Sequence, residues 1–184
     1  MPYCFISGGI IENNIILNDF LAIRRKGTKL FEFVNLKSML EKKYNHSMIE
    51  LKFLGEIGVI GGYNSKKCEY FNMKKKEWKY LPDLIHVREN PSCCVINEKN
   101  IFCFLGYDNE LNKYNNTIEK LDLNININNM KWEEIKHLGM KNNMERKAAS
   151  CLIYNNKGND YIFIVGGINN LDKESRDILL YDEK

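Results

Sequence analysis

Histidine and cysteine have the widest catalytic and metal-binding chemistry of the side chains in this sequence, and their spacing argues against both uses. A zinc or copper site needs several such ligands close together. The three histidines, His46, His86 and His137, lie far apart in the sequence. The cysteines form no CxxC pair, and the adjacent Cys93 and Cys94 would point to opposite faces of a strand. The sequence therefore predicts no metal site.

Motifs for nucleophilic and nucleotide chemistry are also missing from the sequence. It contains no GxSxG motif, no phosphate-binding loop of the Walker type and no Cys–His nucleophile pattern. The glycine pairs at 61–62 and 166–167 follow strand-like runs but open no helix, so they do not fit a dinucleotide-binding turn. We therefore expect no catalytic residues, no cofactor and a function that is not enzymatic.

Composition and charge narrow the class of partner. Of the 184 residues, 44% are hydrophobic and 28% are charged, which is ordinary for a globular protein. The formal net charge of +3 is spread along the chain, and the longest basic run, residues 74–76, lies between two strand-like segments. No apolar run approaches the roughly 20 residues that cross a bilayer. We expect neither nucleic acid nor a membrane as a partner.

Cysteine usage and the N-terminus favour a cytoplasmic protein. No secretory signal pattern is visible at the N-terminus. Four cysteines lie inside apolar strand-like runs, where buried, reduced thiols behave as small hydrophobic residues. These four are Cys4, Cys94, Cys103 and Cys151. An asparagine-rich segment, residues 124–129, is expected to loop out of the fold.

A repeat organises the whole chain and positions these residues. Three runs of bulky apolar residues end in glycine at nearly the same position within their repeat units, and a fourth, shortened run opens the chain. Such self-similarity is the strongest signal of architecture that a sequence offers. The runs lie at residues 3–9, 57–62, 101–107 and 161–167.

The two middle units each predict four short strands joined by turns. In the first of them a continuous apolar run, residues 57–60, is typical of a strand that is covered on both faces. The second unit keeps the order, with longer connections and with Tyr107 assigned to the place of the second glycine. The predicted strands are residues 47–51, 57–60, 68–72 and 77–80, and then 92–96, 100–105, 117–122 and 131–135.

The two end units are incomplete. The first begins with its glycine-terminated strand at residues 3–7 and continues with predicted strands at 14–21 and 29–34, where Phe31 or Phe33 takes the place of tryptophan. Residues 36–43 are expected to form a loop that carries a helical turn. The last unit has predicted strands at 150–154, 161–165 and 178–182.

These units resemble kelch repeats of the β-propeller superfamily. The resemblance rests on the glycine pairs, on Trp78 and Trp132 in the last strands, and on Arg88 and Arg146, which precede the first strand of the next unit. The middle elements are Phe71-Asn72, Leu121-Asp122 and Tyr181-Asp182. The likeness covers nearly the whole chain.

The resemblance implies an all-β fold, a kelch-type β-propeller in which each unit is a four-stranded blade packed face-on against its neighbours. Trp78 and Trp132 are then expected to pack between blades. The chain supplies about 3.5 blades, so we expect one kelch-repeat domain, residues 1–184, that forms an incomplete, open propeller. Its exposed blade edges favour self-association. The blades are residues 1–43 (partial), 44–85, 86–143 and 144–184 (partial).

The resemblance also implies a function, a non-catalytic module that binds a protein or peptide through the loops connecting its strands and blades. The candidate loops are residues 63–67, 81–91, 108–116, 136–147 and 168–175. The candidate partner-binding residues are Tyr63, Arg88, Tyr107, Asn109 and Arg146.

Two alternatives stay open at this point. Arg88 and Arg146 either meet an acidic peptide or tie neighbouring blades together through backbone carbonyls. In addition, the chain can be the propeller portion of a larger kelch-containing enzyme, such as a kelch-domain phosphatase. A catalytic motif downstream of residue 184 would favour the enzyme, because fold alone does not decide function.

Overall fold

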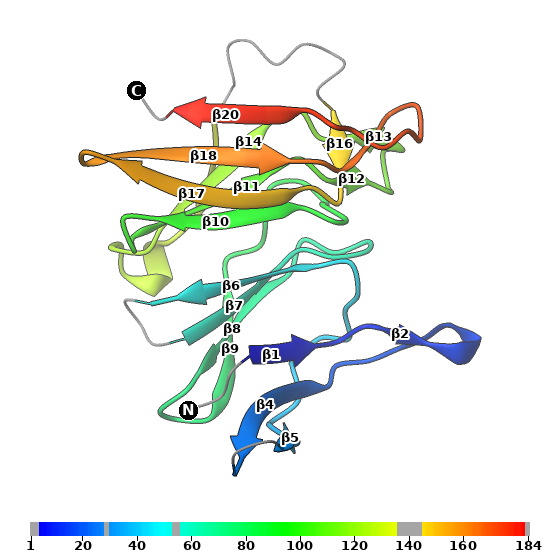
Figure 1. The fold of residues 1–184 in the computed structure, drawn as a ribbon, viewed down its shortest axis with the longest axis vertical. Coiled ribbons are helices and arrows are strands. Elements are labelled where there is room, and N and C mark those ends of the chain that lie inside the picture. Colours follow the sequence, from blue (N-terminus) through cyan, green and yellow to red (C-terminus); the bar gives the residue numbers. More distant parts are fainter. Residues whose placement is uncertain (1–3, 28–29, 53–55, 136–144, 183–184) are drawn as a thin grey trace.

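The computed structural model of the protein describes residues 4–27, 30–52, 56–135 and 145–182. Within these residues the fold is all-β, and most strands belong to four antiparallel sheets, named I to IV, that are stacked in chain order (Figure 1). None of the four sheets closes on itself. Sheet I contains β1 (Cys4–Ser7), β4 (Phe20–Lys26) and β5 (Leu30–Asn35); sheet II contains β6 (Ser47–Leu51), β7 (Glu56–Ile60), β8 (Cys68–Asn72) and β9 (Glu77–Leu81). Sheet III contains β10 (Ser92–Ile96), β11 (Asn100–Phe104), β14 (Ile118–Asp122) and β15 (Trp132–Ile135); sheet IV contains β17 (Ser150–Asn156), β18 (Asn159–Val165) and β20 (Ile178–Asp182).

The four sheets share one strand order and one register. Each is a meander in which consecutive strands pair, and the last residue of the glycine-terminated strand faces the first residue of the next strand. These equivalent pairs are Ser7–Phe20, Ile60–Cys68, Phe104–Ile118 and Val165–Ile178. The first strands of sheets II, III and IV also lie side by side, β6 beside β10 and β10 beside β17. The repeat seen in the sequence is therefore a structural repeat.

Short strand pairs lie in the connections at one edge of the stack, at the right of Figure 1. They are β2 (Ile10–Ile11) with β3 (Ile15–Ile16), β12 (Tyr107–Asp108) with β13 (Lys113–Tyr114), and β16 (Arg146–Lys147) with β19 (Ile168–Asn169). The helical content of the described residues is two 3-10 turns, η1 (Glu12–Asn14) and η2 (Ile127–Asn129). The second turn lies in the asparagine-rich segment, whose residues 124–129 are exposed as expected.

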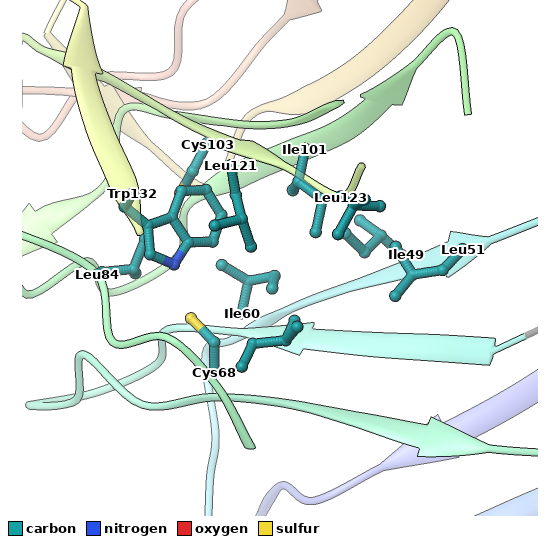
Figure 2. Close-up of a cluster of buried hydrophobic side chains, with 11 residues drawn as sticks. Ile49, Leu51, Ile60, Cys68, Leu84, Ile101, Cys103, Leu121, Leu123 and Trp132 are labelled. Carbon is teal, nitrogen blue, oxygen red and sulfur yellow. The ribbon is translucent and has the colours of Figure 1, made fainter. Parts of the chain in front are cut away.

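Apolar side chains fill the spaces between adjacent sheets. Every residue of β7 is buried, because sheet II is covered on both faces, as its apolar run predicted. Figure 2 shows the cluster between sheets II and III, in which Trp132 lies over Ile60 and Cys68. Trp78 packs between sheets I and II, with its ring 4.9 Å from that of Phe20. The tryptophans thus pack between sheets, as expected.

The tryptophans also hold the connections that precede their sheets. The indole nitrogen of Trp78 donates a hydrogen bond to the carbonyl of Lys37 at 2.7 Å, and that of Trp132 donates to the carbonyl of Pro82 at 2.9 Å. A buried indole N–H needs such a partner. Each tryptophan therefore stabilises both an inter-sheet core and the chain segment that crosses beside it.

Three expectations for the first unit and its connection were wrong. The third strand, expected at residues 14–21, begins at Phe20. The isoleucines before it form the β2–β3 hairpin, closed by a left-handed Asn13 and Asn14, a conformation that asparagine tolerates well. Residues 36–43 carry no helical turn; the segment bends at Leu40 and Glu41, and the amide of Leu40 donates to Glu69 of sheet II instead of to a helical carbonyl. Cys4 is exposed rather than buried.

The assignment of Tyr107 to the second glycine was also wrong. The strand of sheet III ends at Phe104, so Leu105 and Gly106 occupy the two positions of Gly61 and Gly62. Leu105 adopts a φ of 59°, close to the 65° of Gly61. A left-handed leucine is strained, and its side chain is fully buried in the core that sheet III shares with sheet IV.

Candidate functional site

Three buried cations occupy one repeated position, four residues before the first strands of sheets II, III and IV. They are Lys43, Arg88 and Arg146, and their exposed fractions are 3%, 0% and 1%. The spacing to Ser47, Ser92 and Ser150 is the same in each case. Burial of three cations at equivalent positions indicates a structural role, because a buried charge is costly unless it is bonded.

The side chain of each cation bonds to its own sheet. Arg88 Nη1 donates to the carbonyl of Leu105 at 2.7 Å, and Arg146 Nη1 donates to that of Gly166 at 3.1 Å. Lys43 Nζ makes the corresponding bond to Gly61 at 3.4 Å and a shorter one to the carbonyl of Lys67 at 2.7 Å. All three cations therefore satisfy backbone oxygens just after the glycine-terminated strand.

The backbone of each cation bonds to the preceding sheet. The amides of Gly9, Gly62 and Gly106 donate to the carbonyls of Lys43, Arg88 and Arg146 at 2.8, 3.0 and 3.1 Å. Each cation position thus joins two neighbouring sheets, by backbone to one and by side chain to the other. We call each of these sets of bonds an inter-sheet tie.

A buried glutamate completes the tie of sheet III. Glu119 is fully buried and accepts hydrogen bonds from the amides of Ile85 and His86 at 2.6 and 3.2 Å. Its Oε1 lies 2.8 Å from Arg88 Nε. Arg88 also donates to Thr117 Oγ1 at 2.9 Å. The pair is buried and charge-assisted, so it depends on both partners being present.

In sheet II, Glu69 holds the position that Glu119 holds in sheet III, but it makes fewer hydrogen bonds. Glu69 accepts from the amide of Leu40 at 2.7 Å, but its buried Oε1 has no hydrogen-bond partner in the part of the chain that the structure describes. Lys43 lacks the guanidinium fork with which Arg88 reaches Glu119, and its Nζ bonds to backbone carbonyls and Ser65. Burial raises the pKa of Glu69 and lowers that of Lys43, although each charge opposes the shift of the other.

Close approach of backbones explains the glycines at the ties. A Cβ atom on Gly61 would lie 2.7 Å from the carbonyl oxygen of Arg88, and one on Gly106 would lie 2.9 Å from that of Glu89. Both glycines also have positive φ angles, 65° and 94°. A Cβ atom at either position would clash with the backbone of the connection between sheets II and III.

Several tyrosine side chains lie in the loops that these inter-sheet ties hold in place. Tyr63 is exposed and its ring stacks on that of Tyr44 at 4.9 Å, across the connection between sheets I and II. Tyr107 packs edge-on against Tyr114 at 5.0 Å, and Lys147 Nζ lies 5.0 Å from the centre of the Tyr107 ring. We call the surface formed by these five residues and Asn109 the tyrosine rim.

Asn109 is tied to the rim through Glu89. Its amide nitrogen donates to Glu89 Oε2 at 2.8 Å, and that of Asn45 donates to Oε1 at 2.7 Å. Glu89 is buried. The carboxylate therefore links the connection before sheet II, the connection before sheet III and the loop after β11.

The structure thus brings three of the five sequence-predicted site residues, Tyr63, Tyr107 and Asn109, to one edge. It buries Arg88 and Arg146 beneath that edge, where their guanidinium groups donate hydrogen bonds to backbone carbonyls and side-chain oxygens. Sequence reasoning missed Lys43, Glu89, Glu119 and Tyr114. For Lys43 a signal was present, since it stands four residues before a strand that begins with serine, as Arg88 and Arg146 do. Of the expected loop 136–147, residues 136–144 lie outside the described residues.

One serine–histidine contact resembles part of a catalytic pair. Ser7 Oγ lies 2.8 Å from His46 Nε2. Burial, together with the charge of Lys43, lowers the pKa of His46 to about 4. However, the buried Nδ1 of His46 has no hydrogen-bond partner among the described residues, so none of their carboxylates orients the ring as a general base requires. The contact joins sheet I to the connection that follows it.

A cleft of about 670 Å³ runs along the side-by-side first strands and is lined in part by Met48, Glu50, Cys94 and Cys151. Contact with the Cys94 thiol, together with burial, raises the pKa of Cys151, so this thiol is a poor nucleophile. Among the described residues, no group of three or more His, Cys, Asp or Glu side chains could hold a metal ion. Neither of the two 3-10 turns in the described ranges could span a membrane.

Comparison with models of known protein families and with curated protein sequences found no match for this chain.

Proposed function

We propose that residues 1–184 are an arc of a kelch-type β-propeller and act as a non-catalytic module that binds a protein or peptide partner on the tyrosine rim. In this arrangement sheets I to IV are consecutive blades, and β6, β10 and β17 line a common axis. The proposed partner is an extended segment or loop of another protein, and the cytoplasm is the proposed location.

The repeated geometry supports the propeller arrangement. Four meanders of equivalent register follow one another, with the first strands of sheets II, III and IV adjacent and with aromatic side chains in the cores between the sheets. Repeat proteins of this kind need neighbours to bury each unit, and the ties between sheets give each unit such a neighbour. The glycine pairs and cations stand at the places where the backbones of neighbouring sheets meet.

The tyrosine rim is the observation that carries the binding proposal. Tyr63 and Tyr107 are amphipathic rings on loops, and tyrosine is enriched where proteins bind one another. The loop of Tyr107 is held by the buried carboxylate of Glu89 through Asn109, and the loop of Tyr63 is held by backbone hydrogen bonds to Tyr44 and Arg88, so both are ordered before any partner arrives. A preorganised surface loses little conformational entropy on binding.

Photocrosslinking tests the proposal at single residues. p-Benzoylphenylalanine replaces Tyr63 or Tyr107 in the expressed protein, and illuminated cells are searched for protein adducts by mass spectrometry. We expect the same partner at both positions. Ile125 is the matched control, because it is as exposed as Tyr63 (41% against 42%) but lies in the turn between β14 and β15, at the opposite edge of its sheet.

The substitution Tyr63→Ser combined with Tyr107→Ser should weaken binding of the identified partner at least about tenfold, since two interface tyrosines are removed. Ile125→Ser should leave binding unchanged. The rim proposal fails if position 125 captures the same partner as positions 63 and 107, or if the double variant binds as tightly as the original chain.

A further inference from the structure

The cleft along the first strands follows the repeat of the fold. Its described lining residues lie on β6, β10 and β17, in the turns after these strands and at the start of β18. The three strands lie side by side and begin at the equivalent residues Ser47, Ser92 and Ser150. Residues at the same distance from these serines therefore lie at similar heights along the cleft. Strands rise about 3.3 Å per residue, so the cleft spans about 13 Å from the first to the fifth residue after the serine.

The end of the cleft nearest the inter-sheet ties is apolar and carries sulfur. The first residue after each serine is Met48, Cys93 or Cys151, and all three line the cleft. Burial raises the pKa of Cys93, and contact with the Cys94 thiol together with burial raises that of Cys151, so both thiols stay neutral. Neutral thiols and thioethers behave as soft apolar surface. We call this part of the cleft, formed by Met48, Cys93 and Cys151, the sulfur end.

Further along, aliphatic side chains face a carboxylate. Val95 and Ile153 line the cleft three residues after their serines, and Ile153 is 43% exposed. Glu50 holds the same position on β6 and is exposed. The middle of the cleft thus offers apolar contact and one accessible negative charge.

The far end of the cleft is polar and acidic. It lies at the turns that follow the three strands, at the edge opposite to the tyrosine rim (Figure 1). Glu98 and Asp160 contribute carboxylates, and Lys52 contributes one cation. With Glu50, the described lining has three carboxylates and one ammonium, a formal net charge of −2 in a chain whose net charge is +3. We call the part formed by Glu50, Glu98 and Asp160 the acidic end.

Size, wall chemistry and charge together select a ligand. Small-molecule sites are typically clefts of roughly 300–1,000 Å³ with mostly apolar walls and a few polar groups. This cleft has a volume of about 670 Å³. Its negative charge favours a cation, and its apolar length favours an aliphatic body. No aromatic residue is among the described residues that line it, so a quaternary ammonium would lack the aromatic faces on which such cations bind.

We propose that the cleft binds an aliphatic primary amine, with its ammonium group at the acidic end and its chain directed toward the sulfur end. A primary ammonium offers three hydrogen-bond donors, which suits a set of carboxylate acceptors. Sheets II, III and IV supply the described walls, and a further blade of a propeller would face them across the axis. The site is separate from the tyrosine rim, so the inference goes beyond the binding of a protein partner.

Isothermal titration of the 184-residue chain with octylamine tests the inference. We expect a dissociation constant at or below about 1 mM, which a ligand of this size reaches at an ordinary affinity per atom. Octanoate has the same apolar chain with the opposite charge and should bind at least about tenfold more weakly. Lysine blocked at both backbone ends has the same ammonium on a shorter chain. It should also bind at least about tenfold more weakly, because it buries fewer methylene groups.

Variants locate the two ends of the ligand. Glu50→Gln combined with Glu98→Gln should raise the dissociation constant of octylamine at least about fivefold, because two of the three carboxylates lose their charge. Glu133→Gln is the matched control, since Glu133 is also exposed but lies on β15, the last strand of sheet III.

Ile153→Ser should weaken octylamine binding at least about threefold, because it removes apolar contact. Ile125→Ser is its control, with 41% exposure against 43%. Circular dichroism checks that each variant folds, and Met48→Ser replaces Ile153→Ser if that variant does not. In amide-detected NMR spectra, octylamine should shift the backbone resonances of β6, β10 and β17.

The absence of saturable octylamine binding would overturn the inference. So would octanoate or blocked lysine that binds as tightly as octylamine, an unchanged dissociation constant in the double glutamine variant, or amide shifts confined to the rim loops. Photocrosslinking through Tyr63 and Tyr107 reports on the rim alone, so failure of one site is distinguishable from failure of the other.

Discussion

Removal of one buried cation should cost far more stability than removal of an exposed one. Arg88→Met deletes the three hydrogen bonds from the guanidinium to Glu119, Leu105 and Thr117. It also leaves the carboxylate of Glu119 buried with only two amide donors, those of Ile85 and His86. Breaking a buried ion pair from one side typically costs about 3–5 kcal/mol.

Such a loss is large against a total stability of about 5–15 kcal/mol. At about 2–4 °C per kcal/mol for a chain of this size, the melting temperature should fall by about 6–20 °C. Urea unfolding, followed by tryptophan fluorescence, measures the free energy of unfolding directly, and both tryptophans report on inter-sheet cores.

Two companion variants separate the loss of a buried ion pair from the loss of an exposed one and from the effect of the unpaired Glu119 charge. Arg24→Met removes an exposed ion pair with Glu32 that solvent screens, so it should lower stability much less than Arg88→Met. The double variant Arg88→Met with Glu119→Gln should recover part of the loss, because no charge stays buried. The recovery is only partial, since the amides of Ile85 and His86 donate to different oxygens of Glu119 and the single carbonyl oxygen of glutamine replaces one of them. If Arg88→Met costs no more than Arg24→Met, the inter-sheet tie does not stabilise this fold.

Three further predictions concern neighbouring groups. Lys43→Arg should stabilise the chain by about 1 kcal/mol in urea unfolding, because a guanidinium can reach the unpartnered Oε1 of Glu69; a loss of stability would show that the site has no room for the fork. Gly61→Ala should cost at least about 2 kcal/mol more than Gly27→Ala, since both glycines have positive φ but a Cβ on Gly27 meets no atom within 4 Å; equal losses would remove the close-approach argument. The pKa of His46 is lowered to about 4, below the ordinary value of 6.5, so the unfolded chain binds the proton first, and this group's contribution is full above pH 6.5 and is lost as the pH falls toward 4. Over that interval the original chain should lose up to about 3 kcal/mol more stability than His46→Gln, and identical pH profiles of the two would contradict the burial of the neutral ring.

Most strands were predictable because glycine position and apolar runs mark them together. Strands β6, β8, β10 and β20 have the predicted bounds. The first unit was less predictable. Its isoleucines satisfy a strand pattern equally well in a main sheet or in the β2–β3 hairpin, and local sequence does not say which.

The site was predictable in part, because loops on one edge follow from the meander order. Tyr63 and Tyr107 were among the predicted residues, whereas Tyr44 and Tyr114 were not. The burial of Arg88 and Arg146 depends on partners distant in sequence, such as Glu119 and the carbonyl of Gly166. Leu105 was missed for a related reason. Its left-handed backbone is compensated by packing in the core between sheets III and IV, which no local rule reveals.

Aromatic contacts between sheets test the repeated stacking most directly. Carbon-edited nuclear Overhauser spectra of the 184-residue chain should show cross-peaks between the rings of Phe20 and Trp78, and between those of Phe104 and Tyr181, whose centres lie 4.9 and 5.4 Å apart. Backbone cross-peaks that instead join residues 57–62 to 161–167 would place those strands in one sheet and contradict the account.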